Sequence, residues 1–212
     1  MFEETVSLSP LFFLGSSLTI PYLQKSKKTF YSDEFALPST SELSASDEFA
    51  KLFMAYNEEG IYLFAEVKTE VKKVLFPQFR QGDCLEFFID TRDLKTRRGV
   101  SNFCHHFVFF PEEVNGFFGQ EITRFRGGAS RSLCHPKDLK VESEVKPNLY
   151  RMTIHIPKFC LHGFDPSSFD RLGFTYRINR AGDYPQDFAI DSEEFEIETH
   201  PDLWASCKLQ KG

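Results

Sequence analysis

Apolar and polar residues alternate with a period of two along much of this chain, which is the pattern of β-strands with one buried face. The clearest case is the segment 82–90, Gly-Asp-Cys-Leu-Glu-Phe-Phe-Ile-Asp. One predicted face carries Asp83, Leu85, Phe87 and Ile89, and the other carries Cys84, Glu86, Phe88 and Asp90. A carboxylate among aromatic side chains is expected to be paired, to bind a metal or to line a groove, because an uncompensated buried charge is costly.

The same period recurs in segments that are separated by turn residues. Two hairpins are predicted, one from 52–56 and 61–67 around a turn that ends in Gly60, the other from 139–145 and 149–156. Further strands are expected at 103–110, 173–180 and 204–209, and residues 157–161 are expected to form one helical turn. This succession predicts an all-β fold, a two-sheet antiparallel β-sandwich with less than about a tenth of its residues in α-helix.

Length and composition agree with one such domain. A chain of 212 residues is within the range of a single sandwich and can bury a sizeable core without disulfides or metals. The 25 Phe residues, against a single Trp, indicate a thick aromatic core between two sheets. No repeat or linker divides the sequence, and the segments 39–46 and 124–131 are expected to be surface loops. We therefore expect residues 1–212 to form one domain.

Five segments, taken in order, resemble the framework strands of family 9 carbohydrate-binding modules and their DOMON-like relatives. They are the opening hairpin 52–65, the acidic strand 82–90, and the segments 150–157, 173–180 and 201–209. The resemblance covers about residues 52–209 and implies a jelly-roll-like sandwich, on which the N-terminal residues would pack as an extension. It also implies a non-catalytic domain that binds a ligand, with carbohydrate as the ligand class.

The resemblance also indicates where a site would lie and how it has changed. Sugar sites of the family resemble a slot between two tryptophans, but the matching segments 75–80 and 196–200 contain no Trp, and Trp204 matches a framework position that is expected to be buried. Glu86 matches the hydrogen-bonding glutamate of the family, and Arg177 matches a polar position on a later strand. The implied ligand-binding residues are Glu86, Arg177, Phe79, Arg80 and Asn179. An Arg opposite a Glu predicts a buried ion pair that fills the slot, so the sugar site is expected to be diverged or lost.

Other chemistries are less well supported by the residues. Glu86 and Asp90 share a strand face, but four residues of strand separate them by about 13 Å, whereas glycosidase carboxyls lie roughly 5 to 9.5 Å apart; the protein is therefore expected not to be an enzyme. Met54 and Met152 sit in apolar strands, where Met is usually core filler rather than a haem ligand. The acidic run Asp183, Asp187 and Asp191 is expected to be a solvated loop rather than a calcium site.

The five cysteines, Cys84, Cys104, Cys134, Cys160 and Cys207, form no CxxC pair and are odd in number. We expect reduced thiols without a disulfide, no zinc site and a cytoplasmic location. No signal peptide or membrane-spanning segment is expected, because the acidic N-terminus lacks the charge of a leader.

A net charge of −6 argues against nucleic acid as a partner. The expected partner is a carbohydrate or another protein, with no cofactor. The alternatives to a ligand-binding domain are a protein-interaction or structural domain of the same fold without a small ligand, and a haem- or metal-binding protein.

Overall fold

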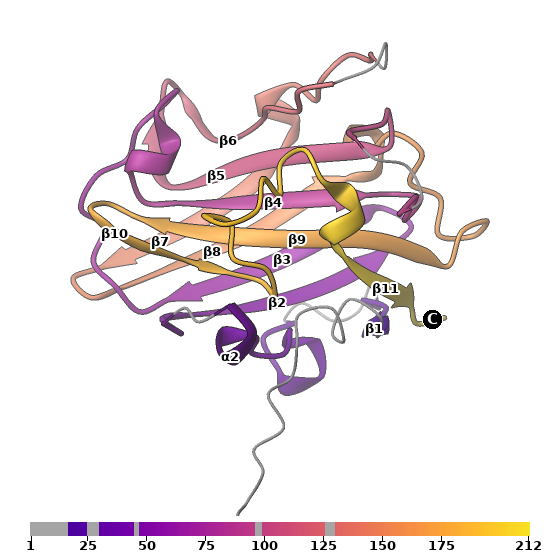
Figure 1. Ribbon diagram of the computed structural model, residues 1–212, viewed down its shortest axis with the longest axis horizontal. Coiled ribbons are helices and arrows are strands. Elements are labelled where there is room, and N and C mark those ends of the chain that lie inside the picture. Colours follow the sequence, from indigo (N-terminus) through magenta and orange to yellow (C-terminus); the bar gives the residue numbers. More distant parts are fainter. Residues whose placement is uncertain (1–16, 25–29, 45–46, 96–98, 126–129) are drawn as a thin grey trace, which may run out of the picture.

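The computed structural model describes residues 17–24, 30–44, 47–95, 99–125 and 130–212, and its strands form two sheets that pack face to face (Figure 1). The seven-stranded sheet has the order β1-β11-β9-β4-β5-β6, and β10 pairs with β9 beside this path. Its strands are β1 (Ser17–Ile20), β4 (Cys84–Asp90), β5 (Cys104–Val114), β6 (Phe117–Glu121), β9 (Arg171–Arg180), β10 (Asp183–Asp187) and β11 (Ala205–Leu209). The four-stranded sheet has the order β2-β3-β8-β7 and consists of β2 (Ala50–Asn57), β3 (Gly60–Val67), β8 (Leu149–Pro157) and β7 (Lys140–Lys146).

The predicted all-β sandwich and both predicted hairpins are confirmed. All strand pairs are antiparallel except β1 with β11, which run parallel. Among the described residues, α-helix is limited to the single turn α2 (Ser41–Ser44), which replaces part of the loop expected at 39–46. The turn expected after β8 is the 3₁₀ turn η4 (Lys158–Cys160), and three strands, β1, β6 and β10, were not predicted.

The core lies between the two sheets and follows from the alternation within each strand. On β4 the inward face carries Leu85, Phe87 and Ile89, and all three side chains are fully buried. Met54 and Met152 are also fully buried in this core, as expected for filler. The strand β8 alternates between buried and partly exposed residues, because its outer face meets solvent, whereas every residue of β4 is buried. The outer face of β4 must therefore be covered by other parts of the chain.

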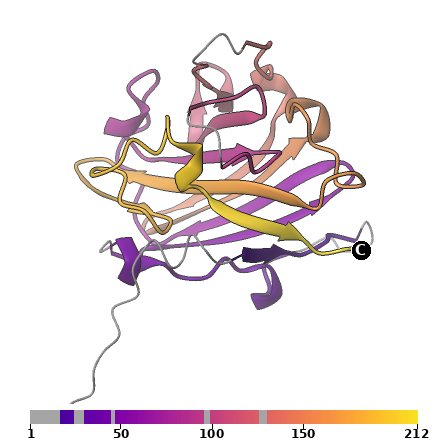
Figure 2. The same cartoon turned by 45° about the vertical axis from the view of Figure 1, so that its right-hand side comes forward.

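Segments N-terminal to β2 pack along the four-stranded sheet. Phe30 and Phe35 join Phe53 and Phe64 in a second apolar cluster on the outer face of this sheet. Isolated bridges link Tyr22 to Tyr56 and Ala36 to Phe53, and Figure 2 shows these N-terminal segments gathered beside β2. Since β2 is the first strand of its sheet, these contacts cover backbone groups that an edge strand would otherwise expose. The assignment of the chain to one domain and the jelly-roll-like order of connections stay predictions.

The cysteine prediction is wrong for two residues, because Cys134 and Cys160 form a disulfide. The loop after β6 carries Cys134 against the turn η4, so that the two Cα atoms lie 4.9 Å apart although 26 positions separate them in sequence. Cys84, Cys104 and Cys207 are free and buried. The cytoplasmic location stays a prediction and no longer has the support of a fully reduced cysteine set.

The acidic run near the C-terminus also differs from expectation. Asp187 is buried rather than solvated, and one of its carboxylate oxygens accepts hydrogen bonds from the backbone and the hydroxyl of Ser192, each at 2.9 Å. Asp183 stays exposed and pairs with Arg180. Within the described residues, no helix is long and apolar enough to cross a membrane.

Candidate ligand-binding site

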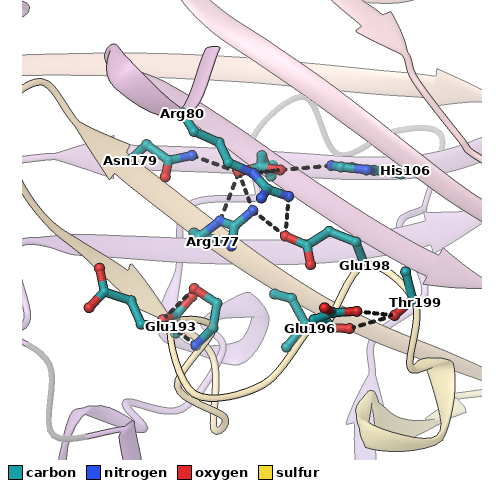
Figure 3. A network of polar contacts seen from close by, with 12 residues as sticks. Arg80, His106, Arg177, Asn179, Glu193, Glu196, Glu198 and Thr199 are labelled. Atoms are coloured by element: carbon teal, nitrogen blue, oxygen red, sulfur yellow. Dashed lines mark hydrogen bonds and ion pairs between the residues drawn. The ribbon is translucent and has the colours of Figure 1, made fainter. Parts of the chain in front are cut away.

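Glu86 is the centre of a polar network on the outer face of the seven-stranded sheet. Figure 3 shows its partners His106, Arg177 and Asn179 together with Arg80 and Glu198. The antiparallel register of β4 and β9 places Glu86 directly opposite Arg177, so the two side chains project from the same face. The Nε and Nη2 atoms of Arg177 each lie 2.7 Å from Oε1 of Glu86. The predicted pair is therefore confirmed, and it is buried: the Glu86 side chain is 0% exposed and that of Arg177 is 5% exposed.

Two further residues hold the Glu86 carboxylate. Asn179, two residues along β9, donates its amide N–H to Oε1 at 2.8 Å. His106, from β5 on the other side of β4, places its Nε2 atom 2.9 Å from Oε2. The ring of His106 stacks on Phe88 with a centroid distance of 4.0 Å, which fixes its orientation. Neighbouring strands on both sides of β4 thus supply polar groups to one carboxylate.

This environment determines the protonation of both partners. Burial by itself would raise the pKa of Glu86, but the hydrogen bond from His106 and the positive charge of Arg177 outweigh it and lower the pKa to about 2. Burial lowers the pKa of His106 below its usual value, although the Glu86 carboxylate opposes that shift. At neutral pH Glu86 is ionised and His106 is neutral. The Nε2 atom of His106 must then carry the hydrogen that it donates to Glu86.

Arg80 and Glu198 form a second layer above the buried pair. Oε1 of Glu198 accepts a hydrogen bond from Nη2 of Arg177 at 2.7 Å and another from Nη2 of Arg80. The Nε atom of Arg80 lies 3.7 Å from Oε2 of Glu86. Exposure increases outward, since the side chain of Glu198 is 19% exposed and that of Arg80 is 49% exposed. The network therefore runs without interruption from the sheet to the surface.

Glu198 belongs to the segment 191–200, here called the strap, which crosses in front of β4 and β9 before the 3₁₀ turn η5 (Pro201–Leu203) (Figure 1). The strap is anchored by Ile197, which is 1% exposed and accepts a hydrogen bond from the indole N–H of Trp204 at 2.8 Å. Trp204 itself is 1% exposed and packs against Phe88 at a centroid distance of 5.8 Å. The predicted burial of Trp204 is therefore confirmed, and its structural role stays a prediction.

A groove of about 540 Å³ opens over this part of the sheet. Its lining combines charged or imidazole side chains with aromatic rings that are each partly exposed: Arg80, His106, Arg124, Glu198, Phe76, Phe79 and Phe125. Phe79 lies in the 3₁₀ turn η2 (Phe79–Gln81) and meets the ring of His106 edge-on at a centroid distance of 6.3 Å. Aromatic faces beside a few convergent polar groups are typical of small-molecule sites, and such faces pack well against the apolar faces of sugars.

The structure brings together all five residues predicted to bind a ligand, but in two different settings. Glu86, Arg177 and Asn179 are buried within the network, whereas Arg80 and Phe79 lie at the groove. A ligand in the groove would therefore meet Arg80 and Phe79 first. It would reach Glu86 only after Arg80 and Glu198 had moved. The ligand-binding role of all five residues stays a prediction.

Sequence reasoning missed His106 and Glu198 as members of the site. His106 lies in the strand predicted at 103–110, but the period-two pattern did not show that this strand pairs with the acidic strand. Glu198 lies in a loop without periodicity, so no sequence pattern indicated that its side chain reaches Arg177. The missing information in both cases is the pairing between segments that are far apart in sequence.

Asp83 and Asp90, the other two acids of the segment 82–90, have structural roles. Oδ2 of Asp83 accepts hydrogen bonds from the backbone N–H groups of Lys72 and Lys73, both at 2.8 Å. Asp90 accepts from the N–H groups of Arg92 and Leu94, at 2.9 and 2.8 Å, and so closes the turn after β4. Both carboxylates thus compensate backbone groups at the ends of one strand.

Within the described part of the chain, one group of potential metal-ligating side chains lies close together. It consists of Cys134, Asp138 and Cys160, whose ligand atoms are within 4.8 Å of one another. The two sulfurs are bonded to each other, and a disulfide lacks the thiolate that coordinates a metal. This group therefore has the chemistry of a crosslink rather than of a metal site.

Comparison with known proteins supports the fold. No protein-family profile matches the sequence, and no curated protein matches it either. Among solved structures, the chain is similar to a family 9 carbohydrate-binding module from Caldicellulosiruptor kristjanssonii in complex with cellotriose, with a TM-score of 0.63 and 16% identity over 93% of this chain and 95% of that chain. The complex of a family 9 module from the same organism with glucose gives a TM-score of 0.61 and 16% identity over 93% of this chain and 97% of that chain. The protein thus has a family 9 carbohydrate-binding module-like fold.

Proposed function

We propose that this protein is a non-catalytic domain of the carbohydrate-binding module type, with a sugar site that has diverged. The observation that carries the proposal is the groove beside the Glu86 network, where partly exposed aromatic rings stand beside Arg80, His106 and Glu198. A saccharide needs flat apolar surfaces for its ring faces and charged or polar groups for its hydroxyls, and this groove offers both. The similarity of the fold to modules solved with cellotriose and glucose supports the same ligand class.

The state of Glu86 supports the proposed divergence. Its carboxylate already receives hydrogen bonds from Arg177, Asn179 and His106, and it has no exposed surface. A ligand hydroxyl would have to displace these partners to reach it, which costs more than binding to a free carboxylate. Neutral sugars are therefore expected to bind weakly, through the outer residues Arg80 and Phe79 rather than through Glu86.

Binding of oligosaccharides, measured by titration calorimetry and by thermal shift, tests the proposal. A ligand that binds only the native state raises the unfolding midpoint. Phe79→Ala and Arg80→Ala should each weaken binding by about tenfold, a typical effect for an aromatic or charged contact. Tyr184→Ala is the matched control, because Tyr184 is 72% exposed and lies outside the groove lining.

Two results would count against the proposal. If no saccharide binds at millimolar concentration, a protein-interaction domain of the same fold becomes the better account. If saccharides bind but Phe79→Ala and Arg80→Ala have the same affinity as wild type, the ligand lies elsewhere on the molecule and the groove is not its site.

A further inference from the structure

The carboxylate of Glu198 lies where two guanidinium groups converge. Its Oε1 atom takes hydrogen bonds from both Arg177 and Arg80, one buried and one half-exposed at the groove (Figure 3). Guanidinium groups form strong charge-assisted hydrogen bonds to carboxylates, and each arginine donates one such bond through its Nη2 atom here. Arg80 and Glu198 line the groove, and Arg177 contacts Glu198 from the buried side. The protein therefore already contains a carboxylate-binding site at its groove, and its own side chain occupies it.

The two glutamates of the network compensate different arginines: Glu86 compensates Arg177, and Glu198 compensates Arg80. Glu86 is held from inside the sheet by Arg177, Asn179 and His106, so Arg177 keeps a buried counter-charge whether or not Glu198 is present. Glu198 is the outer acid, and its main task is to balance Arg80. Because His106 is neutral, displacement of the Glu198 side chain would leave the groove with one excess positive charge, which favours an anionic ligand.

The strap allows the side chain to move without unfolding its backbone. Ile197 is buried in the core, and its carbonyl is fixed by Trp204, while the N–H of Thr199 donates to the carbonyl of Glu196 at 2.9 Å. The residues on both sides of Glu198 are thus held in place. The side chain of Glu198 is partly exposed at the groove. A change of its rotamer would therefore move the carboxylate away from the two arginines without a backbone movement.

From these contacts we infer that the ligand is an acidic saccharide, a sugar that carries a carboxylate, and that this carboxylate replaces that of Glu198 between Arg80 and Arg177. The inference rests on the proposed function and narrows its ligand class. The aromatic rings of Phe79, Phe76 and Phe125 would contact the sugar ring, while the two arginines would select for the acid group. Glu198 acts as an internal competitor that lowers the apparent affinity by the fraction of molecules in which it covers the site.

Calorimetric titration with a matched pair of ligands tests this inference. The acidic probe is trigalacturonate, and the neutral probe is the same trimer with each carboxylate reduced to a primary alcohol. Glu198→Ala should bind trigalacturonate about tenfold or more tightly than wild type, and should bind the neutral trimer with unchanged affinity. Adding Arg80→Ala to Glu198→Ala should remove the gain. The control is Glu196→Gln, because Glu196 lies on the same strap and contacts Thr199 instead of the arginines.

The possible outcomes separate the inference from the proposed function. If the neutral trimer binds as well as the acidic one and Glu198→Ala changes neither affinity, the groove binds sugar but the carboxylate inference is wrong. If neither trimer binds wild type or Glu198→Ala, although Glu198→Ala unfolds at the same temperature as wild type, then the inference and saccharide binding in this groove both fail. A gain that sodium acetate at equal concentration abolishes fully would show a carboxylate site without sugar recognition, and would overturn the saccharide part alone.

Discussion

At the scale of single residues, the arrangement around Glu86 depends on compensation of buried charge. Glu86 and Arg177 face each other across two central strands, and neither can be hydrated in place. Removing one member of a buried pair leaves the other without compensation, and this costs about 3 to 5 kcal/mol in known cases. Removing both members together costs much less, because no charge is left behind. This asymmetry gives a direct test of the pairing.

Arg177→Met should lower the free energy of unfolding by about 3 to 5 kcal/mol, since it leaves Glu86 buried without its main counter-charge. The double variant Glu86→Gln/Arg177→Met should recover a large part of that loss. Urea denaturation measures both values. Arg171→Met is the control on the same strand, because the side chain of Arg171 is 55% exposed and should matter by less than about 0.5 kcal/mol. Equal losses in the single and double variants would contradict the pairing argument.

Asp187 is a buried acid whose pKa is raised, whereas the pKa of Glu86 is lowered. Burial raises its pKa to about 6, although the hydrogen bonds from Ser192 act in the other direction. The native state then binds a proton more readily than the unfolded chain, whose Asp has a pKa of 3.8. Stability contributed by this group is therefore fully present below about pH 4 and is lost as pH rises through 6. The cost of the ionised form at neutral pH is about 3 kcal/mol.

Asp187→Asn should remove that dependence. The difference in unfolding free energy between variant and wild type should shift in favour of the variant by about 3 kcal/mol between pH 4 and pH 7. Urea denaturation at the two pH values measures it. Asp183→Asn is the comparison, because Asp183 is an exposed residue of the same strand. A difference that stays constant with pH for Asp187→Asn would show that this carboxyl titrates in the same way in the folded and unfolded chain.

At the scale of elements, Trp204 holds the strap in place at the point where the chain enters β11. Trp204 fills the space behind Phe88 and fixes the strap through its hydrogen bond to Ile197. Trp204→Ala should cost about 3 to 5 kcal/mol, as do other large core truncations. Trp204→Phe keeps a ring in place but loses the indole N–H, and should cost less. Thermal and urea unfolding measure both, and an unchanged midpoint for Trp204→Ala would mean that the ring contributes nothing to the core.

The disulfide between Cys134 and Cys160 ties the loop after β6 to η4. This loop carries Arg131, which donates to the buried carboxylate of Glu121 and to the carbonyl of Cys104. Closing a loop of 26 positions stabilises the fold by about 3 kcal/mol, because it restricts the unfolded chain. The double variant Cys134→Ser/Cys160→Ser should lose that amount.

Reductant provides the matched control for the disulfide. Dithiothreitol should lower the unfolding midpoint of the wild-type protein and leave that of the double variant unchanged, since the remaining thiols are already free. A wild-type midpoint that does not respond to reductant, together with free-thiol counts that equal the number of cysteines, would show that the bond does not form in solution.

The elements could be predicted from sequence where one strand face is buried and the other is wet. The segments of β7 and β8 alternate, and two apolar runs around the turn at Gly60 mark β2 and β3; both predicted hairpins are the observed ones. The five predicted ligand residues also gather at one place. The short strand β10 lacks such a pattern, and β1 is an edge strand that pairs with β11 from the far end of the chain. Cys134 and Cys160 meet through loop packing, which leaves no periodic trace. Their pairing and the position of Glu198 therefore required the structure.

At the scale of the whole molecule, two buried glutamates lie on opposite faces of the seven-stranded sheet. Glu86 is on the outer face with Arg177, and Glu121 pairs with His105 and Arg131 at the inner side. Burial alone would raise the pKa of Glu121, but hydrogen bonds from His105 and Arg131 outweigh it and lower the pKa to about 2, as for Glu86. Both acids are ionised in the native state over a range where the unfolded chain, with a pKa of 4.5, takes up protons.

The sign of the resulting acid effect follows from these shifts. A carboxyl whose pKa is lowered on folding contributes stability that is present above about pH 4.5 and is lost as pH falls toward 2. Each shift corresponds to about 3 kcal/mol, so the two together approach the entire stability of a typical domain, which is about 5 to 15 kcal/mol. The protein should therefore lose a large part of its stability between pH 4.5 and 2. Glu86→Gln and Glu121→Gln should each be less stable than wild type at pH 7. The free energy of unfolding of each variant should also fall less steeply between pH 4.5 and 2, as measured by urea denaturation at fixed ionic strength.

Replacing the exposed Glu112 by Gln is the control, and it should leave this pH dependence nearly unchanged. An acid profile of either buried variant that runs parallel to wild type would mean that the ion pairs around these carboxylates do not persist in solution.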